Sequence, residues 1–137
     1  MILAALRTLW TLPTTCVGLV VGGMCTPLGA RWQFHTGVLE CHGGAVAWLL
    51  EHVPPIEGGA MAMTLGDVVI GRSVAALDLT RAHERVHVRQ CHRWGPLFIP
   101  AYLLASAIAC LRKQDPYRAN PFEREAYAIS EARQGGN

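Results

Sequence analysis

The first thirty residues contain the longest uncharged run of the chain. Arg7 is their only charged residue, and the uncharged run from Thr8 to Ala30 is 23 residues long. A helix of about 20 apolar residues can cross the hydrocarbon core of a bilayer, so we expect an apolar N-terminal helix over residues 1–30. A membrane-inserted or membrane-lying helix, a signal peptide and a buried core helix all fit this pattern. We favour the membrane-associated helix, because no A-x-A cleavage site follows the run.

Shorter apolar runs, broken by glycine and proline, predict strands in the middle of the chain. Residues 31–50 are interrupted by Gly37 and by Gly43-Gly44, which favours two short strands joined by a glycine turn. Residues 51–59 contain a proline pair and a glycine pair and should form a loop. Residues 60–72 are typical of a single strand with a bulge at Gly66. These runs predict a small antiparallel sheet.

Helical patterns follow. Residues 80–94 contain no Gly or Pro, and Asp78 or Thr80 can cap the start of a helix there. One side of this helix carries four basic positions and should face water. The four residues are Arg81, Arg85, Arg89 and His92.

Two more helices complete the predicted α+β fold. Residues 97–111 are mostly apolar but short for a full span, so a buried helix is favoured over a second transmembrane helix. Alternatively, residues 1–30 and 97–111 pack together in or on a bilayer. Asn120 and Pro121 are a typical cap and first residue of a last helix, with two glutamates close behind.

The composition allows one domain and disfavours several function classes. Of 137 residues, 51% are hydrophobic and only 16% are charged, which again raises the expectation of membrane contact. The net charge of +2 comes from scattered basic residues, so we expect no nucleic-acid partner. Five cysteines without C-x-x-C spacing argue against a disulfide framework and a cysteine-rich zinc module. Cys91, four residues after His87, is the one cysteine placed to approach a metal.

The chemistry is concentrated in the sequence His83-Glu84-Arg85-Val86-His87, an H-E-x-x-H pattern. Residues four apart lie on the same face of a helix, so the two imidazoles can bind one metal ion. Glu84 lies beside that ion and can take a proton from metal-bound water. The pattern predicts a metal site for hydrolysis. A pair of structural helix histidines is the alternative.

HERVH followed by Asn120-Pro121-Phe122-Glu123-Arg124-Glu125-Ala126-Tyr127 resembles the gluzincin class of zinc metallopeptidases. The resemblance covers residues 60–132 and implies Zn²⁺ held by His83, His87 and Glu123, with Glu125 as the second choice for the third ligand. Family members commonly carry an aspartate that orients a ligating histidine; Tyr127 stands at that position here. The resemblance implies a peptide or protein substrate that pairs with an edge strand before the zinc helix. Residues 31–137 are then a compact metallopeptidase-like domain that follows the apolar helix.

The expected function is therefore a zinc-dependent peptidase with Glu84 as general base, membrane-associated or otherwise cytoplasmic. A fourth group should stabilise the oxyanion. Five residues are chemically able: Tyr102, Tyr117, Tyr127, His35 and His92. The main alternative is a non-catalytic, membrane-associated metal-binding or scaffold protein. A membrane protein without metal is a further alternative, and a di-iron protein is disfavoured because no second E-x-x-H is present.

Overall fold

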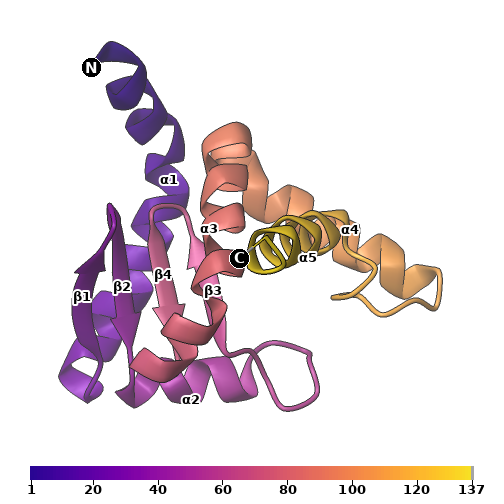
Figure 1. Ribbon diagram of the computed structural model, residues 1–137. Coiled ribbons are helices and arrows are strands. Elements are labelled where there is room, and N and C mark those ends of the chain that lie inside the picture. Colours follow the sequence, from indigo (N-terminus) through magenta and orange to yellow (C-terminus); the bar gives the residue numbers. More distant parts are fainter. Residues whose placement is uncertain (137) are drawn as a thin grey trace.

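The computed structural model describes residues 1–136 and confirms the α+β class (Figure 1). Four strands form one sheet in the order β1-β2-β4-β3. They are β1 (Arg31–His35), β2 (Val38–His42), β3 (Ala62–Leu65) and β4 (Val68–Gly71).

The sheet is mixed, whereas a purely antiparallel sheet was expected. The β1–β2 and β3–β4 pairs are antiparallel, but the central β2–β4 pair is parallel. The reason is the connection after β2. Helix α2 (Gly44–His52) and the following loop carry the chain to the far edge, and the β3–β4 hairpin then inserts β4 beside β2.

Two strand predictions were wrong in detail. Residues 44–50, expected in a strand, belong to the helix α2, because Val46 and Leu50, four residues apart, are both buried on one face of that helix. Residues 60–72 form two strands and not one. Leu65 pairs with Val68, so Gly66 lies in a two-residue hairpin turn with φ of 70°.

Helices cover both faces of the sheet. Helix α1 (Ile2–Cys25) and α2 pack on the face that carries Cys41, Val68 and Ile70. Helix α3 (Val74–Trp94) packs on the other face, where Leu77 and Val88 contact Val69. Successive strand residues alternate between the two layers, as the period of two requires.

Helix α3 begins earlier than predicted, and Ser73 caps it. The Ser73 hydroxyl accepts a hydrogen bond from the backbone N–H of Ala76 at 3.1 Å. Neither Asp78 nor Thr80 is the cap; the Thr80 hydroxyl instead donates to the carbonyl of Ala76.

The basic side of α3 is not fully solvated. Arg81 and Arg85 lie over the buried carboxylate of Glu40 on β2, with Nη2 atoms 3.1 Å and 3.6 Å from its oxygens. Gln33 also donates to Glu40, at 2.7 Å. Burial alone would raise the pKa of Glu40, but the hydrogen bonds from Arg81 and Gln33 outweigh it and lower the pKa. These contacts tie α3 to the sheet.

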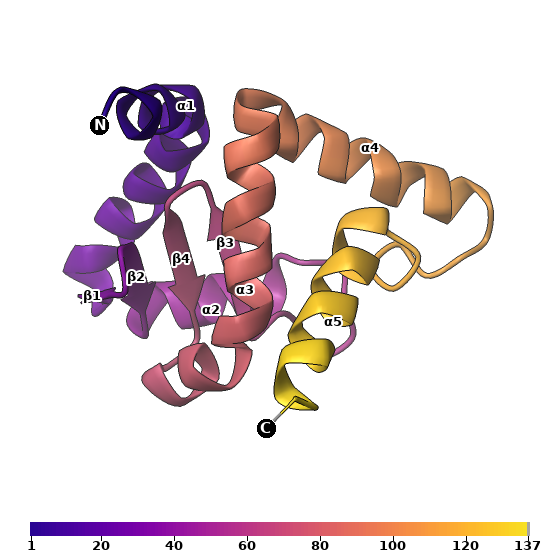
Figure 2. The same cartoon turned by 45° about the horizontal axis from the view of Figure 1, so that its top comes forward.

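The last two helices extend from the end of α3 (Figure 2). A short 3-10 turn, η2 (Gly95–Leu97), leads into α4 (Phe98–Leu111), and α5 (Pro121–Gln134) returns to pack against α3. The predicted cap of α5 is confirmed, since Asn120 Oδ1 accepts from the N–H of Phe122 at 3.0 Å. The expected burial of α4 is wrong, because only Phe98 and Ala109 of this helix are buried.

Helix α1 is anchored through its second half. Residues 1–10 are all exposed, while Thr11, Thr14, Gly18 and Gly22 are buried. Two helical segments, Ile2–Leu28 and Val74–Leu111, are long and apolar enough to cross a membrane by length and composition. Buried core helices and leader sequences meet the same criterion.

We expect Glu40→Ala to lower the free energy of unfolding by about 3 kcal/mol, because it leaves two arginines without their buried partner. Glu51→Ala is the matched control: this glutamate is exposed and only 4.0 Å from Arg72, so its loss should cost about 1 kcal/mol or less. Denaturant unfolding of both variants measures the difference.

The stabilisation by Glu40 should also depend on pH. Because the pKa of Glu40 is lowered, its contribution to the free energy of unfolding is present above the unfolded pKa and is lost as the pH falls through the folded pKa. If Glu40→Ala and Glu51→Ala were equally stable, Glu40 would not be the stabilising partner of Arg81 and Arg85.

Candidate metal centre

Three side chains from two helices meet in a small buried group that can hold a metal ion: His83, His87 and Glu123. His83 Nε2 lies 2.9 Å from Glu123 Oε2 and 3.1 Å from His87 Nε2, and the third side of the triangle is 3.3 Å. Tetrahedral ligands about 2.0–2.1 Å from a zinc ion lie roughly 3.3 Å apart. The triangle is therefore close to the size that such an ion requires.

The two histidines are one turn apart on α3, as the sequence spacing predicted, and Glu123 comes from the first turn of α5. The buried Asn120 fixes that turn. Its side-chain amide donates to the carbonyl of Tyr102 at 3.1 Å and to the Ser106 hydroxyl at 2.8 Å. The α5 cap thus also joins α5 to α4, and it directs Glu123 at the histidines.

The electrostatics of the group favour an ionised carboxylate. Burial would raise the pKa of Glu123, but hydrogen bonds with His83 and His87 outweigh it and lower the pKa to about 2. The Tyr102 hydroxyl donates to the other carboxylate oxygen at 2.6 Å. Burial would lower the pKa of His87, but the hydrogen bond to Glu123 and the charge of Glu84 help raise it to about 9. Without metal, a proton on His87 therefore occupies the position that a cation would take.

Gln90 orients His87, although the sequence did not single out Gln90 for this role. His87 Nδ1 donates to Gln90 Oε1 at 2.8 Å, which leaves Nε2 facing the other ligands. Gln90 Nε2 in turn donates to Glu125 Oε2 at 2.8 Å and to the carbonyl of Phe122 at 3.0 Å. Gln90 follows His87 by three residues, a spacing at which two side chains meet on one face of a helix, so the sequence did contain a signal for this contact.

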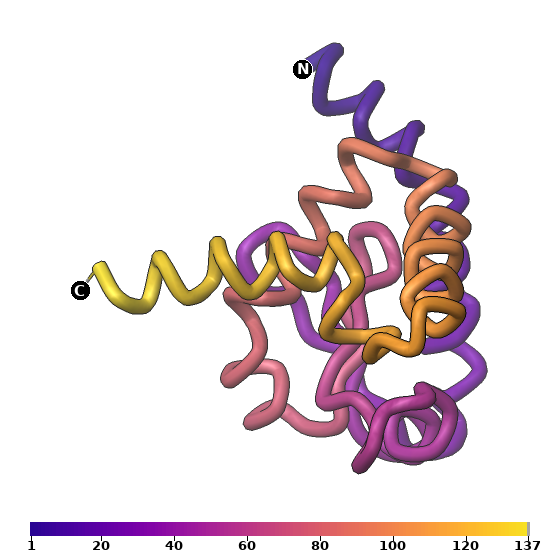
Figure 3. The backbone as a smooth tube through the Cα atoms, turned by 90° about the vertical axis from the view of Figure 1, so that its right-hand side faces the viewer, coloured from indigo at the N-terminus to yellow at the C-terminus, as the bar shows by residue number. Residues whose placement is uncertain are grey.

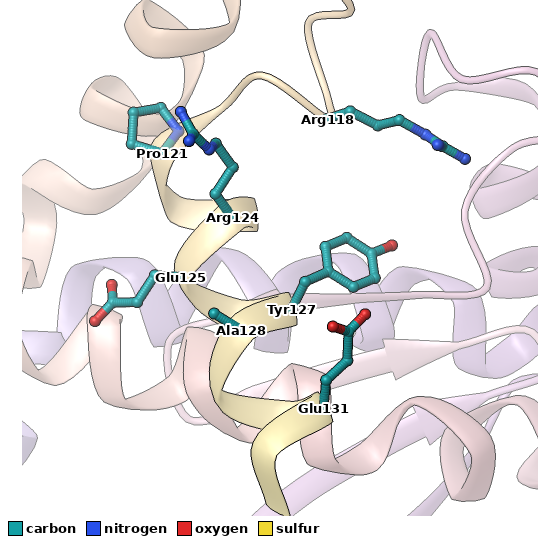
Figure 4. Close-up of a pocket in the computed structure, with 7 residues that line it drawn as sticks. All are labelled: Arg118, Pro121, Arg124, Glu125, Tyr127, Ala128 and Glu131. Atoms are coloured by element: carbon teal, nitrogen blue, oxygen red, sulfur yellow. The ribbon is translucent and has the colours of Figure 1, made fainter. Parts of the chain in front are cut away.

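Glu125 lies outside the metal-ligand group. It accepts hydrogen bonds from Gln90 and from Arg93. Figure 4 shows it projecting from the opposite side of α5 to Tyr127 and Glu131, beside a shallow surface depression. The structure thus brings Glu123 to the histidines and leaves Glu125 as part of the support behind His87.

Tyr127 contacts the group through its ring. The ring centre lies 4.5 Å from that of His83, in a tilted arrangement. Within residues 1–136, the buried Nδ1 of His83 has no hydrogen-bond partner. In the family that this chain resembles, an aspartate carboxylate accepts a hydrogen bond from a ligating histidine. At His83 no other acceptor among residues 1–136 takes that place.

Glu84 lies beside the group rather than in it. Its Oε2 accepts a hydrogen bond from the Thr64 hydroxyl of β3 at 2.7 Å, and the same hydroxyl is 3.2 Å from the Glu84 carbonyl oxygen. Both residues are buried. The Thr64 contact holds the carboxyl against the sheet, so that Glu84 lines the same cavity as His83 and His87.

That cavity has a volume of about 530 Å³ and runs along an open edge of the sheet. Its floor carries the ligand group, and it is lined by Met63 and Leu65 of β3 and by Met61 just before that strand. Its other apolar residues come mainly from α3 and α4: Leu79, Phe98, Ile99 and Leu103. Strand β3 pairs only with β4, so its outer edge has free backbone donors and acceptors facing this space.

Three of the five oxyanion candidates line this cavity: Tyr102, Tyr117 and Tyr127. The hydroxyls of Tyr117 and Tyr127 lie 3.1 Å apart, whereas that of Tyr102 is bonded to Glu123. The two histidine candidates lie elsewhere: His35 is on β1 at the opposite edge, and His92 bonds Asp67 at 2.6 Å. Cys91 is fully buried and is not a member of the ligand group.

No family model, curated protein or solved structure matches this chain.

Glu123→Ala should abolish stoichiometric binding of a divalent metal, because it removes the one carboxylate of the ligand group. Glu125→Ala is the matched control on the same helix and should retain most of the metal, since it removes only a hydrogen-bond partner of Gln90. We expect it to weaken the affinity for the metal by at most about 10–100-fold. Elemental analysis of purified proteins measures both. Loss of metal in Glu125→Ala alone would show that the wrong glutamate is assigned.

Metal binding should release about one proton near pH 7, because His87 must lose its proton to become a ligand. Affinity should rise by about tenfold per pH unit and level off near pH 9, where His87 is already neutral. Calorimetric titration in two buffers of different ionisation enthalpy counts the protons. Binding without proton release would contradict the proposed state of His87.

Proposed function

We propose that this chain is a zinc-dependent metallopeptidase that hydrolyses peptide bonds, with His83, His87 and Glu123 as metal ligands and Glu84 as general base. One observation carries the proposal: two imidazoles and a carboxylate converge on one point, while a second carboxyl, that of Glu84, lies beside them and is held by the Thr64 hydroxyl. Two histidines, a glutamate and an open position are a known ligand set of catalytic zinc. The same residues carry the resemblance to the gluzincins.

Each residue has a chemical task in this proposal. A bound zinc ion would lower the pKa of water to about 7 and polarise the scissile carbonyl. Glu84 takes the proton of the attacking water and later gives it to the amine that leaves when the C–N bond breaks. Thr64 keeps the Glu84 carboxyl in place through the hydrogen bond at 2.7 Å.

The cavity suits an extended peptide. A segment lying along β3 can form backbone hydrogen bonds with the open edge of that strand, while its side chains enter the space between β3 and α4. That space is lined mostly by apolar side chains, so we expect apolar residues next to the scissile bond. Tyr117 and Tyr127 line the cavity with their hydroxyls hydrogen-bonded to each other at 3.1 Å, so the hydroxyl that accepts this bond keeps its own proton for an oxyanion.

The second candidate is a metal-binding protein without turnover. It is supported by the buried Nδ1 of His83, which has no partner among residues 1–136 where the gluzincin pattern supplies a carboxylate. The two candidates share the metal site and differ only in whether Glu84 acts on a substrate.

We expect Glu84→Gln to retain full metal content and to lower kcat by about 10²–10⁴-fold, the usual effect of losing a general base. Glu131→Gln is the matched control, because Glu131 lines the same cavity but is exposed. Cleavage of unfolded protein mixtures, followed by mass spectrometry of the products, measures turnover. Normal turnover in Glu84→Gln would refute its role as base. Metal-loaded wild type without any cleavage would favour the non-catalytic candidate.

A further inference from the structure

Helix α1 buries its small and polar residues and exposes its large apolar ones. Its buried face consists of small and polar residues at helical spacing: Thr11, Thr14, Gly18, Gly22 and Cys25. Its exposed face carries large apolar side chains, such as Leu9 and Met24, which are 64% and 71% exposed. A helix of a water-soluble protein normally buries its apolar side and exposes its polar side. Helices in lipid use small residues for close helix packing and turn apolar side chains outward.

Helix α4 likewise turns large apolar side chains outward. Tyr102 and Ser106, one turn apart, point inward and bond Glu123 and Asn120. Leu104, Ile108 and Leu111 lie on the exposed side, and residues 98–111 contain no charged side chain. Arg112 and Lys113 follow directly, at the point where the helix ends.

Helices α1 and α4 are joined through η2, which contacts both of them. The Thr14 hydroxyl donates to the carbonyl of Gly95, at the junction of α3 and η2, at a distance of 3.2 Å. Gly95 has φ of 54°, and the ring of Trp10 fills the space that a side chain would need. Figure 3 shows α1 and α4 on the same side of the molecule, with the end of α5 pointing away on the other side.

We propose that the exposed faces of α1 and α4 form one lipid-facing surface that inserts into one leaflet of a bilayer. This inference does not depend on the metal site or on catalysis. Residues 2–9 are exposed, and this end of α1 projects beyond the rest of the fold (Figure 1). Eight helical residues span roughly 12 Å, which is somewhat less than half of the ~30 Å hydrocarbon core.

Lipid fits this surface better than a protein partner does. Arg7 is the only charged residue in 1–30, and its long side chain can reach the headgroups. The exposed Thr8 hydroxyl is satisfied within its own helix by the carbonyl of Ala4 at 3.0 Å, as hydrocarbon surroundings require. A protein interface would instead be expected to carry a polar rim with hydrogen-bonding groups. The basic residues after α4 suit the headgroup level.

The test is flotation of the full chain, made by cell-free translation with neutral phosphatidylcholine vesicles. The protein should float with the vesicles and remain bound in 1 M salt, because apolar burial and not charge holds it. The variant Leu9→Glu/Leu104→Glu should lower the bound fraction by about tenfold or more. Val74→Glu is the control, since Val74 is also exposed but lies at the start of α3, on the other layer; it should float like wild type.

A second measurement does not rely on charged variants. Lipids with brominated chains should quench the fluorescence of the wild type more than that of Trp10→Phe, because Trp10 is half-exposed where α1 meets η2, at the edge of the inserted surface. A chain that stays monomeric and soluble beside the vesicles would overturn the proposal. So would equal flotation of all variants, or a lipid-free dimer that the two glutamates convert to monomers, which would identify a second copy as the occupant.

Discussion

A carboxylate removed from water must find partners, because an isolated buried charge costs several kcal/mol. Three buried glutamates of this protein find their partners on or around α3, and each joins a different element to it. Glu40 of β2 pairs with Arg81 and Arg85. Glu84 of α3 accepts from Thr64 of β3. Glu123 of α5 meets the two histidines. Helix α3 is thereby fixed in rotation and height between the sheet and α5, and the remaining helices are arranged around it.

The candidate site follows from this arrangement. With α3 fixed, the helix period alone places both imidazoles on the side facing α5. The buried cap of α5 brings its first turn to the same point, and Gln90 sets the orientation of His87 from behind. Thr64, which holds Glu84, belongs to the strand whose free edge lines the cavity. The contacts that stabilise α3 therefore also position the groups that hydrolysis would need, beside a place where an extended chain can lie.

Much of the high hydrophobic content of the chain lies in side chains that are exposed on the surface. The sheet and its two helix layers form an ordinary core, whereas α1 and α4 keep many of their large apolar side chains outside. Helix α1 approaches the β3–β4 hairpin closely, because Gly66 in the hairpin turn has no side chain and leaves room for the backbone of Thr15. Helix α4 belongs both to the exposed apolar surface and to the wall of the metal cavity. In the proposed orientation, the cavity would open close to the surface of the bilayer.

Local features were predictable from the sequence, because neighbours along the chain determine them. The spacing of His83 and His87, the Asn120 cap and the apolar run before Arg31 each follow from one stretch and the geometry of a helix. Glu123 was selected by the resemblance. The partners that Glu84 and Glu40 find on other elements were not predictable, because Thr64 and Arg81 lie 20 and 41 residues away from them in sequence. Only the tertiary structure decided that β4 inserts beside β2, that Arg81 faces Glu40, and that Glu125 supports Gln90. It also decided that the apolar side of α1 faces outward, since a periodic pattern shows that a helix has two faces but not which one the protein covers.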